Sequence, residues 1–381
     1  MNWLLEWRDS IGSLRLRTEH QLESARWAYN RIGGCGDFTV VLSRPFRDTG
    51  GINANWDLRI YRVLSASPEL WYRGYAEEIA QDRKDGSQDR LTIRGNGYVG
   101  HLDRVLITSS YANTKVESIV ADIMLNRGVV SKTSVTFSSS NITTTSFTAT
   151  SIDFRNVTAG RALNDLAELI GSYEWGVDRN AALFFHPRRT ASTLPSSADM
   201  RFVAEGEAKY LTISDRFKEL INSVFVEAAK SGGTTIVVES VNSASQVSYG
   251  RREARVSIAT LASSVDAAQV GASIISEKSS PTREIRFHVY RETMVESVAL
   301  ATTGQVTPML SIVSPTTKYG EKKYGTFRYS GIRRYSLTKA SYEFGASGFF
   351  VVIEAGETQR SADTYAMTIA NELDAIRQRN L

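Results

Sequence analysis

Short segments in which apolar and polar residues alternate make up much of this chain, and this period of two constrains its fold more than any other feature. Residues 56–63 alternate over most of their length, as a half-buried β-strand does. Residues 70–79 are rich in aromatic side chains, and residues 90–94 continue the pattern beyond a polar turn. Earlier, residues 23–30 and 37–42 flank a glycine-rich reversal that is typical of a hairpin. The sequence therefore predicts an antiparallel β unit in the first part of the chain.

A helical period replaces the alternation in the middle of the chain. Thr114 and Glu117 have the spacing of a capping box, and an apolar stripe follows over residues 116–124. Thr158 is expected to cap a second amphipathic helix that ends at Gly171. An aromatic hairpin is predicted directly after this helix. These elements predict an α/β module placed between β regions.

The last third of the chain mixes strands with two further helices. Residues 265–278 are predicted to form a helix that stops before Pro281, and residues 348–354 are predicted to form a strand. Ser361 is expected to cap a C-terminal helix with one apolar stripe, which must pack on its own domain or on a neighbouring subunit. The stripe is the candidate contact site, and its residues are Tyr365, Ile369, Leu373 and Ile376.

Composition and charge exclude several classes of protein. With 381 residues, 42% of them hydrophobic and 23% charged, the chain is long enough for more than one globular core. No apolar run reaches the roughly 18 residues of a membrane-spanning helix, and the charged N-terminus does not fit a signal peptide, so we expect a cytosolic product. A net charge of +4 without a long basic run does not indicate dedicated nucleic-acid binding. The single cysteine, Cys35, excludes an intrachain disulfide.

Two pairs of segments have a similar spacing. Residues 71–75 and 91–94 are echoed by residues 328–332 and 350–354, each pair with polar residues between its members. This spacing fits a duplicated β-barrel, but two unrelated antiparallel hairpins would also show it. Both interpretations stay open at the level of the sequence.

Motifs that are associated with chemistry have simpler structural interpretations in this sequence. Residues 95–100 match G-x-G-x-x-G, but the strand-like residues 101–108 follow where a nucleotide site needs a helix. The four histidines lie far apart and lack the spacing of a zinc site. Glu77 and Glu78 are adjacent on a predicted strand, so they point to opposite faces and do not form a glycosidase pair. We therefore predict no catalytic residue, no metal site and no cofactor, and expect that the protein is not an enzyme.

Several motifs in one order resemble the hub proteins of long-tailed bacteriophages. Their order spans nearly the whole chain, and the family includes relatives of the contractile-phage baseplate hub and of the base of the type VI secretion spike. The motifs are Gly33-Gly34-Cys35-Gly36-Asp37-Phe38, Trp71-Tyr72-Arg73-Gly74, the helix and hairpin over residues 162–187, and Tyr249-Gly250-Arg251-Arg252 before a later helix.

The resemblance implies a mainly β, α+β fold with two tail-tube-like antiparallel β-barrels. The first barrel would comprise residues 1–108 and be completed by residues 201–230, with an inserted α/β module at residues 109–200. The second barrel would comprise residues 231–360 with one helix, and residues 361–381 would form the C-terminal amphipathic helix.

The resemblance also implies a structural role in the virion, in a tail tip or baseplate assembled in the host cytoplasm. Such hubs are homotrimers whose six barrels form a ring. The ring joins the hexameric tail tube or distal tail protein to threefold spike or fibre proteins, and encloses a channel for the tape-measure protein and, transiently, DNA. An alternative is a carbohydrate-binding or cell-wall-degrading phage tail component, which needs surface aromatics beside paired acids.

Overall fold

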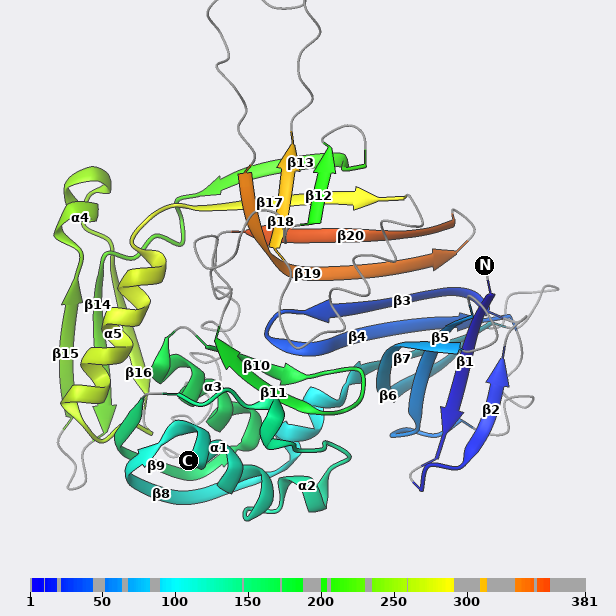
Figure 1. Ribbon diagram of the computed structural model, residues 1–381, viewed down its shortest axis with the longest axis horizontal. Helices are drawn as coiled ribbons and strands as arrows, with labels where there is room; N and C mark the ends of the chain where they lie inside the picture. The colour runs from blue at the N-terminus through cyan, green and yellow to red at the C-terminus, as the bar shows by residue number, and fades with distance from the viewer. Residues whose placement is uncertain are drawn as a thin grey trace, which may run out of the picture.

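The computed structural model places most of the chain in β-strands, with helices gathered in one region (Figure 1). Strand and helix bounds below refer to the residues that it describes. These are residues 2–9, 11–18, 22–43, 52–63, 68–82, 90–145, 147–171, 173–187, 200–203, 207–229, 235–258, 260–290, 309–313, 333–345 and 348–356.

One large sheet of 15 strands organises the molecule. Its main path is antiparallel at every step. In spatial order the strands are β13 (Lys209–Arg216), β17 (Thr282–Val289), β20 (Gly348–Gly356), β19 (Arg333–Gly345), β3 (Leu22–Asn30), β4 (Gly33–Leu42), β7 (Arg90–Gly97), β6 (Pro68–Asp82), β5 (Asp57–Val63), β1 (Asn2–Arg8) and β2 (Leu14–Thr18).

Two branches leave this path. β19 also pairs with β18 (Met309–Val313), which pairs in parallel with β12 (Met200–Val203). The hairpin of β10 (Tyr173–Val177) and β11 (Leu183–Pro187) joins through a short parallel contact between β10 and β4. The first branch extends the sheet, and the second attaches the helical region to it.

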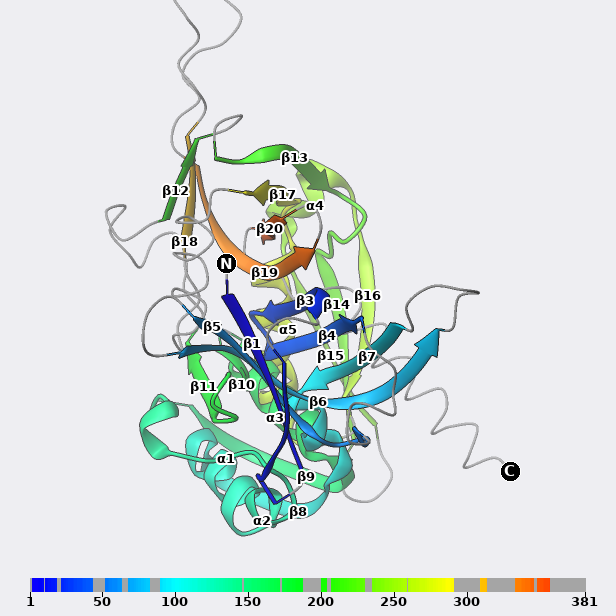
Figure 2. The same cartoon turned by 90° about the vertical axis from the view of Figure 1, so that its right-hand side faces the viewer.

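The helical region contains two smaller sheets with helices packed on them. β8 (Leu106–Lys115) pairs with β9 (Thr148–Thr158), and β14 (Ser223–Ala229) lies between β15 (Thr235–Val241) and β16 (Glu253–Ile258). Figure 2 looks from the side of β1 and β2 and places β14, β15 and α5 behind the large sheet. The helices are η2 (Tyr98–Arg104), α1 (Val116–Leu125), α2 (Val129–Lys132), η3 (Ser139–Asn141), α3 (Ala159–Ile170), α4 (Ser243–Tyr249) and α5 (Ser264–Lys278).

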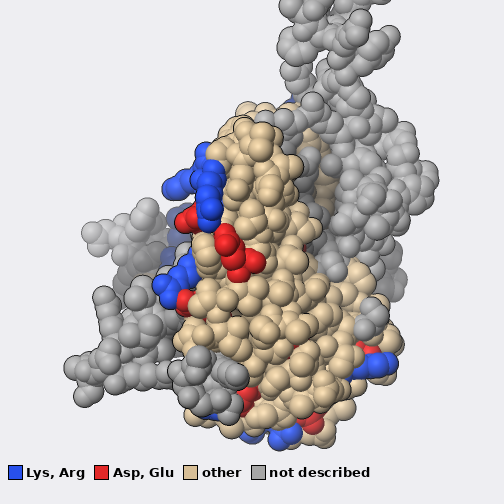
Figure 3. Space-filling model, turned by 90° about the vertical axis from the view of Figure 1, so that its left-hand side faces the viewer, with Lys and Arg blue, Asp and Glu red and all other residues tan. Residues whose placement is uncertain are grey.

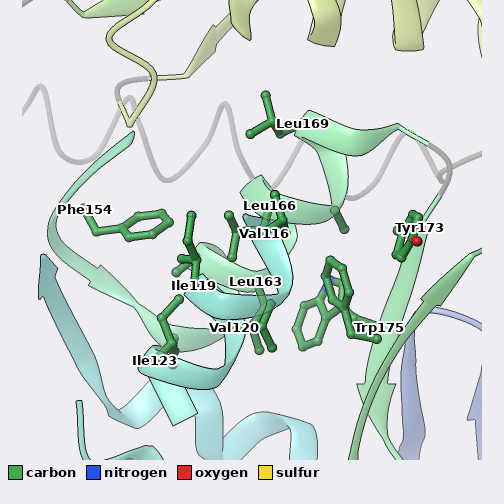
Figure 4. Close-up of a cluster of buried hydrophobic side chains, with 14 of the residues drawn as sticks. Val116, Ile119, Val120, Ile123, Phe154, Leu163, Leu166, Leu169, Tyr173 and Trp175 are labelled. Atoms are coloured by element: carbon green, nitrogen blue, oxygen red, sulfur yellow. The ribbon is translucent and has the colours of Figure 1, made fainter. Parts of the chain in front are cut away.

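Apolar side chains form one core for the large sheet and another for the helical region. The first core includes a cluster of aromatic rings around Trp3, which contacts Trp27, Trp71 and Phe349 at centroid separations of 4.9–5.4 Å. The second core packs the apolar stripes of α1 and α3 against Phe154, Tyr173 and Trp175 (Figure 4). Burial of both stripes agrees with the helical period in the sequence.

Several predicted boundaries are confirmed. The Thr158 hydroxyl accepts a hydrogen bond from the Arg161 amide at 3.2 Å, and the helix that it caps gives way to Gly171 at φ +84°. α5 covers the predicted helix at residues 265–278, and the aromatic hairpin forms as β10 and β11. Local sequence signals are sufficient here, because each capping or helix-breaking residue lies at the end of the element that it delimits.

The predicted capping box is wrong. Helix α1 begins at Val116 behind Lys115, whose side chain makes no cap, and Thr114 belongs to the end of β8. Glu117 instead accepts a hydrogen bond from the Thr145 hydroxyl at 2.8 Å. The strand reaches directly into the helix, so the Thr114 hydroxyl donates to the Ala112 carbonyl and no hydroxyl remains for the helix.

The strand predicted for residues 101–108 is also wrong in its first half. Residues Tyr98–Arg104 form a 3-10 helix, and β8 begins only at Leu106. His101 and Leu102 turn into the helical core, so burial in three dimensions overrides the weak alternation of this segment.

The large sheet is mainly antiparallel, as expected, but its described strands form a continuous path and do not close into barrels by pairing end to end. Residues 201–230 were expected to complete the first β unit. Within them, β13 pairs with β17, and β14 lies in the sheet of β15 and β16. Among the described residues, no helix is long and apolar enough to cross a membrane.

Candidate assembly surfaces

Two groups of strands in the large sheet have the same spatial order. In the first group the order is β1-β5-β6-β7-β4-β3, and in the second it is β12-β18-β19-β20-β17-β13. When the strands are matched by their place in this order, the two groups also follow the same order along the chain. In this matching β3 corresponds to β13, and β6 corresponds to β19. One difference remains, because β12 pairs with β18 in parallel whereas β1 and β5 are antiparallel. The shared topology supports a duplicated β unit.

An irregularity of strand pairing falls at the same place in both groups. The register between β6 and β7 shifts at Glu77, and the register between β19 and β20 shifts at Thr338. Two positions beyond the shift, β7 presents Ile93 and β20 presents Ile353, both fully buried. Residues 91–94 thus correspond to the strand at 350–354, as in the repeat predicted from the sequence. With Glu77 placed on Thr338, residues 72–75 correspond to residues 333–336 and not to residues 328–332, which lie outside the described residues.

The two groups meet where β3 pairs with β19. Trp27 on β3 stacks on Tyr342 on β19, with ring centroids 5.7 Å apart and planes 14° from parallel. The Arg31 amide donates to the Thr338 carbonyl at 2.9 Å, at the bulge of β19. Trp27 is only 2% exposed. This contact, which we call the internal seam, buries aromatic surface contributed by both groups.

The face of the sheet opposite the core is polar across the internal seam. Opposite charges alternate along it from β13 to β6. Because most of these side chains are exposed, each pair adds little stability, and the main result is a hydrated face with nearly balanced charge. Between neighbouring strands the ion pairs are Arg216–Glu284 (2.8 Å), Arg286–Glu354 (3.8 Å), Arg26–Glu343 (3.5 Å) and Arg94–Glu78 (2.8 Å), and Lys339 on β19 reaches across β3 to Asp37 on β4 (3.9 Å).

An aromatic cluster lies beside these charges, near the edge strand β13. His288 and Phe350 are stacked with centroids 5.8 Å apart, and Tyr290 lies 5.2 Å from Phe350. Tyr210 contacts the His288 ring at 5.4 Å and is 75% exposed. The edge of the sheet therefore presents aromatic surface to solvent.

The junction between the large sheet and the helical region is buried and polar. Arg31 follows β3 and lies 3.2 Å from the Glu174 carboxylate on β10, and both side chains are at most 3% exposed. The His186 ring lies 3.6 Å from the same carboxylate. Gly34 packs against the Val177 backbone, so a Cβ at this position would lie 2.1 Å from the Val177 carbonyl oxygen. The early glycine turn thus serves as the contact point for the helical region.

The glycine-rich segment at residues 95–100 has a packing role. A Cβ at Gly95 would lie 2.0 Å from the Tyr75 carbonyl oxygen, and a Cβ at Gly97 would lie 1.9 Å from the Cys35 carbonyl oxygen. These glycines let three strands approach closely, which is a common use of glycine in sheets. The segment lies in an antiparallel sheet and leads into η2, so it lacks the βαβ context of a nucleotide site.

The other residues that the sequence analysis weighed as candidates for chemistry do not form a common site among the described residues. Cys35 is 1% exposed, and burial raises the pKa of its thiol to about 12. His101 contacts Tyr75 at 4.1 Å, and burial lowers the pKa of its imidazole to about 4, so the ring is neutral at pH 7. Glu77 and Glu78 bind different partners, Arg104 and Arg94. The described residues contain no group of three or more potential metal ligands.

One buried acid in the helical region has a strongly shifted pKa. Asp165 on α3 is 4% exposed, and burial raises the pKa of its carboxyl to about 7. Arg161 at 2.7 Å and the Thr260 hydroxyl at 3.0 Å oppose this effect by lowering the pKa, and burial prevails. The acid joins α3 to the segment before α5, which is a structural position.

The outer face of the β14–β16 sheet is a further exposed surface (Figure 3). Ion pairs link its strands, as Arg251 lies 3.0 Å from Glu239 and Arg255 binds Glu227. At its end, Val247 on α4 is 90% exposed. Charged side chains gather along one side of the view in Figure 3, beside a broad area without them.

The contact residues predicted from the sequence, Tyr365, Ile369, Leu373 and Ile376, lie outside the described residues. The sequence reasoning did not identify β13 as a strand. Its signal was present, because Leu211-Thr212-Ile213-Ser214 alternates apolar and polar residues, but the run is short and lies between charged residues.

No protein-family model matches the sequence, and a comparison with curated proteins finds no match. Solved structures do match. The 43 kDa tail protein of prophage MuSo2 from Shewanella oneidensis has a TM-score of 0.62 at 12% identity, covering 94% of this chain and 98% of its own. A tail protein from Neisseria meningitidis MC58 has a TM-score of 0.62 at 11% identity, covering 94% and 97%. The prophage tail protein gp18 from Listeria monocytogenes EGD-e has a TM-score of 0.53 at 10% identity, covering 98% and 100%. Over nearly its whole length, the chain therefore has the fold of phage tail proteins.

Proposed function

We propose that the chain is the structural hub of a bacteriophage tail tip or baseplate. Three copies would form a ring in which each chain contributes two tube-like β units. The observation that carries this proposal is the duplicated strand order in a chain that shares its fold with prophage tail proteins over nearly its full length. A duplicated unit in a threefold ring presents six similar units, which matches a hexameric tube on one side and threefold proteins on the other.

We assign the units as follows. The first tube-like unit comprises residues 1–108, and the α/β module at residues 109–200 is inserted after it. The expected second unit, residues 231–360, is drawn here as β12 and β13 with the strands within residues 282–356, because residues 235–278 pack in the β14–β16 sheet and the helical core. Residues 361–381, which lie outside the described residues, would supply the C-terminal contact helix, with Tyr365, Ile369, Leu373 and Ile376 as its stripe. Closure of each unit into a barrel is part of the proposal.

The polar face of the large sheet would line the channel of the ring. Its support is the row of opposite charges across eight neighbouring strands, β13 to β6, which gives this face a hydrated, nearly balanced surface. The channel would pass the tape-measure protein and then DNA. The outer partners would be the tail tube or distal tail protein and the spike or fibre proteins, in the virion.

Light scattering coupled to size-exclusion chromatography tests the proposal. A homotrimer of a 42.2 kDa chain has a mass of about 127 kDa, and negative-stain images of this species should show a ring with a central opening. The measurement should be repeated at increasing protein concentration, because assembly follows mass action. A single species of about 42 kDa at all concentrations, without rings in the images, would overturn the proposal.

A further inference from the structure

We propose that the free edge of β13 in one copy pairs with the C-terminal half of β6 in the next copy. The pairing is antiparallel and repeats the internal seam between β3 and β19. This inference rests on the proposed ring of copies and names the contact that forms it. The partner is thus a second copy of this chain, and the recognition elements are two strand edges.

The equivalence of β6 and β19 fixes one side of this contact. With Glu77 placed on Thr338, the first partner pair beyond the bulge is Glu78 with Arg94 in β6 and β7. In β19 and β20 it is Lys339 with Glu354. In the internal seam, the residues of β19 from Lys339 to Phe344 pair with β3. The corresponding part of β6 begins at Glu78.

The equivalence of β3 and β13 fixes the other side. Asp37 on β4 lies opposite Asn96 on β7, and Glu284 on β17 lies opposite Gly356 on β20, so β4 and β17 align through these positions. The neighbours of β4 and β17 then align in turn. Phe38 on β4 and Ile285 on β17 are equivalent, because each follows the aligned residue, Asp37 or Glu284. Trp27 lies opposite Phe38, and Ile213 lies opposite Ile285. Ile213 is therefore the counterpart of Trp27.

Both edges lack a strand partner among the described residues. β13 ends the main path of the sheet, and its only strand partner in the described chain is β17. β6 pairs with β5 only as far as Tyr75, and Ala76 completes this contact through the Trp56 carbonyl. Beyond Ala76, the described β6 has a partner on the β7 side alone. An exposed strand edge of this length invites pairing with another chain.

Transfer of the internal register fixes which residues of the two edges lie opposite each other. Glu78 comes to lie opposite Arg216, Ala80 opposite Ser214, and Gln81 opposite Ile213. Arg216 already contacts Glu219 and Glu284, so Glu78 would add a third acid of opposite charge from the next copy. Cross-strand pairs of opposite charge stabilise a sheet, and like charges in these positions oppose it.

The difference in burial between the two equivalent positions also points to this contact. Trp27 is 2% exposed because β19 of the other group covers it, whereas Ile213 is 52% exposed. Tyr210 on the same strand is 75% exposed. A neighbouring β6 would cover Ile213 as β19 covers Trp27. Because each contact uses two different edges, the arrangement is head-to-tail and forms a ring when its rotation closes.

A cysteine pair tests the register directly. In the variant Ala80→Cys/Ser214→Cys, antiparallel neighbours lie about 4.5–5.5 Å apart between Cα atoms, which suits a disulfide. The native Cys35 is buried and does not compete. The matched control is Ala80→Cys/Tyr210→Cys, in which the second cysteine is four residues, or about 13 Å, further along β13. Both variants are oxidised mildly and compared on non-reducing gels, and their masses are measured by light scattering.

The expected result is an interchain disulfide ladder that ends at the covalent ring, at least tenfold more intense for the Ser214 pair than for the Tyr210 control. If the protein forms rings but the Ser214 pair does not cross-link above the control, the strand pairing is refuted and the proposed hub function stands. If the protein is monomeric and neither pair cross-links, both proposals fall. Cross-linking at the Tyr210 control alone would refute the register.

Discussion

The contact between Gly34 and Val177 gives a sharp test of how the helical region is attached to the large sheet. Gly34 has φ +75°, and a Cβ built on it would lie 2.1 Å from the Val177 carbonyl oxygen, within the short parallel contact of β4 with β10. In Gly34→Ala, an ordinary contact of 3.4 Å requires the backbones to separate by about 1.3 Å, because the near atom is backbone and no side chain can rotate away. The substitution therefore disrupts the only described strand pairing between β10 and the large sheet.

The magnitude follows from two contributions. Alanine in a left-handed conformation costs roughly 1 kcal/mol relative to glycine. Loss of one or two buried backbone hydrogen bonds, together with looser packing of Val177, adds about 2–4 kcal/mol. We expect Gly34→Ala to lower the free energy of unfolding by about 3–5 kcal/mol in total.

Gly12→Ala is the matched control. Gly12 has φ +83°, and nothing lies within 4 Å of the Cβ that alanine would add. This variant should lose only about 1 kcal/mol. Urea unfolding followed by tryptophan fluorescence and far-ultraviolet circular dichroism measures both variants. Equal losses in the two variants would refute the argument, because the conformational cost is shared and only Gly34 has the backbone contact.

Further predictions concern buried charge and the exposed edge. Glu174→Gln leaves Arg31 without its buried carboxylate and should lower the free energy of unfolding by about 3–5 kcal/mol. The exposed control Glu253→Gln, whose carboxylate pairs with Arg251, should cost less than about 1 kcal/mol when both variants are titrated with urea. For Asp165, the pKa of about 7 in the folded protein lies above the ordinary value of 3.8, which applies to the unfolded chain. Between these two values the folded state keeps a proton that the unfolded state loses. The stability of the protein therefore falls as pH rises from about 4 to 7. Asp165→Asn does not titrate, so its stability relative to the native protein should rise between pH 4.5 and pH 8, and a constant difference in urea midpoints would contradict this. Ile213→Ser should shift the ring towards single copies in light scattering at a given concentration, while the free energy of unfolding of the single copy stays unchanged within about 0.5 kcal/mol.

The sequence alone determined most local elements. The period of two located β5, β6 and β7, and the apolar stripes with Thr158 and Gly171 located α3, because these signals act between residues close in the chain. The order of motifs also led to the phage tail fold. The false capping box at Thr114 shows the limit of such signals, since the strand before α1 used the same residues.

Only the tertiary structure decided which strands are neighbours. An alternating strand specifies that one of its faces is buried, but it does not specify which partner covers that face. The pairing of β3 with β19 joins residues about 310 positions apart, and the place of β13 beside β17 brings an exposed edge to the end of the sheet. The buried pair of Arg31 and Glu174 likewise depends on two segments that meet only in the folded chain. The physical reason is that period and propensity are properties of short segments, whereas strand partners and buried charge pairs are settled when distant segments share one core.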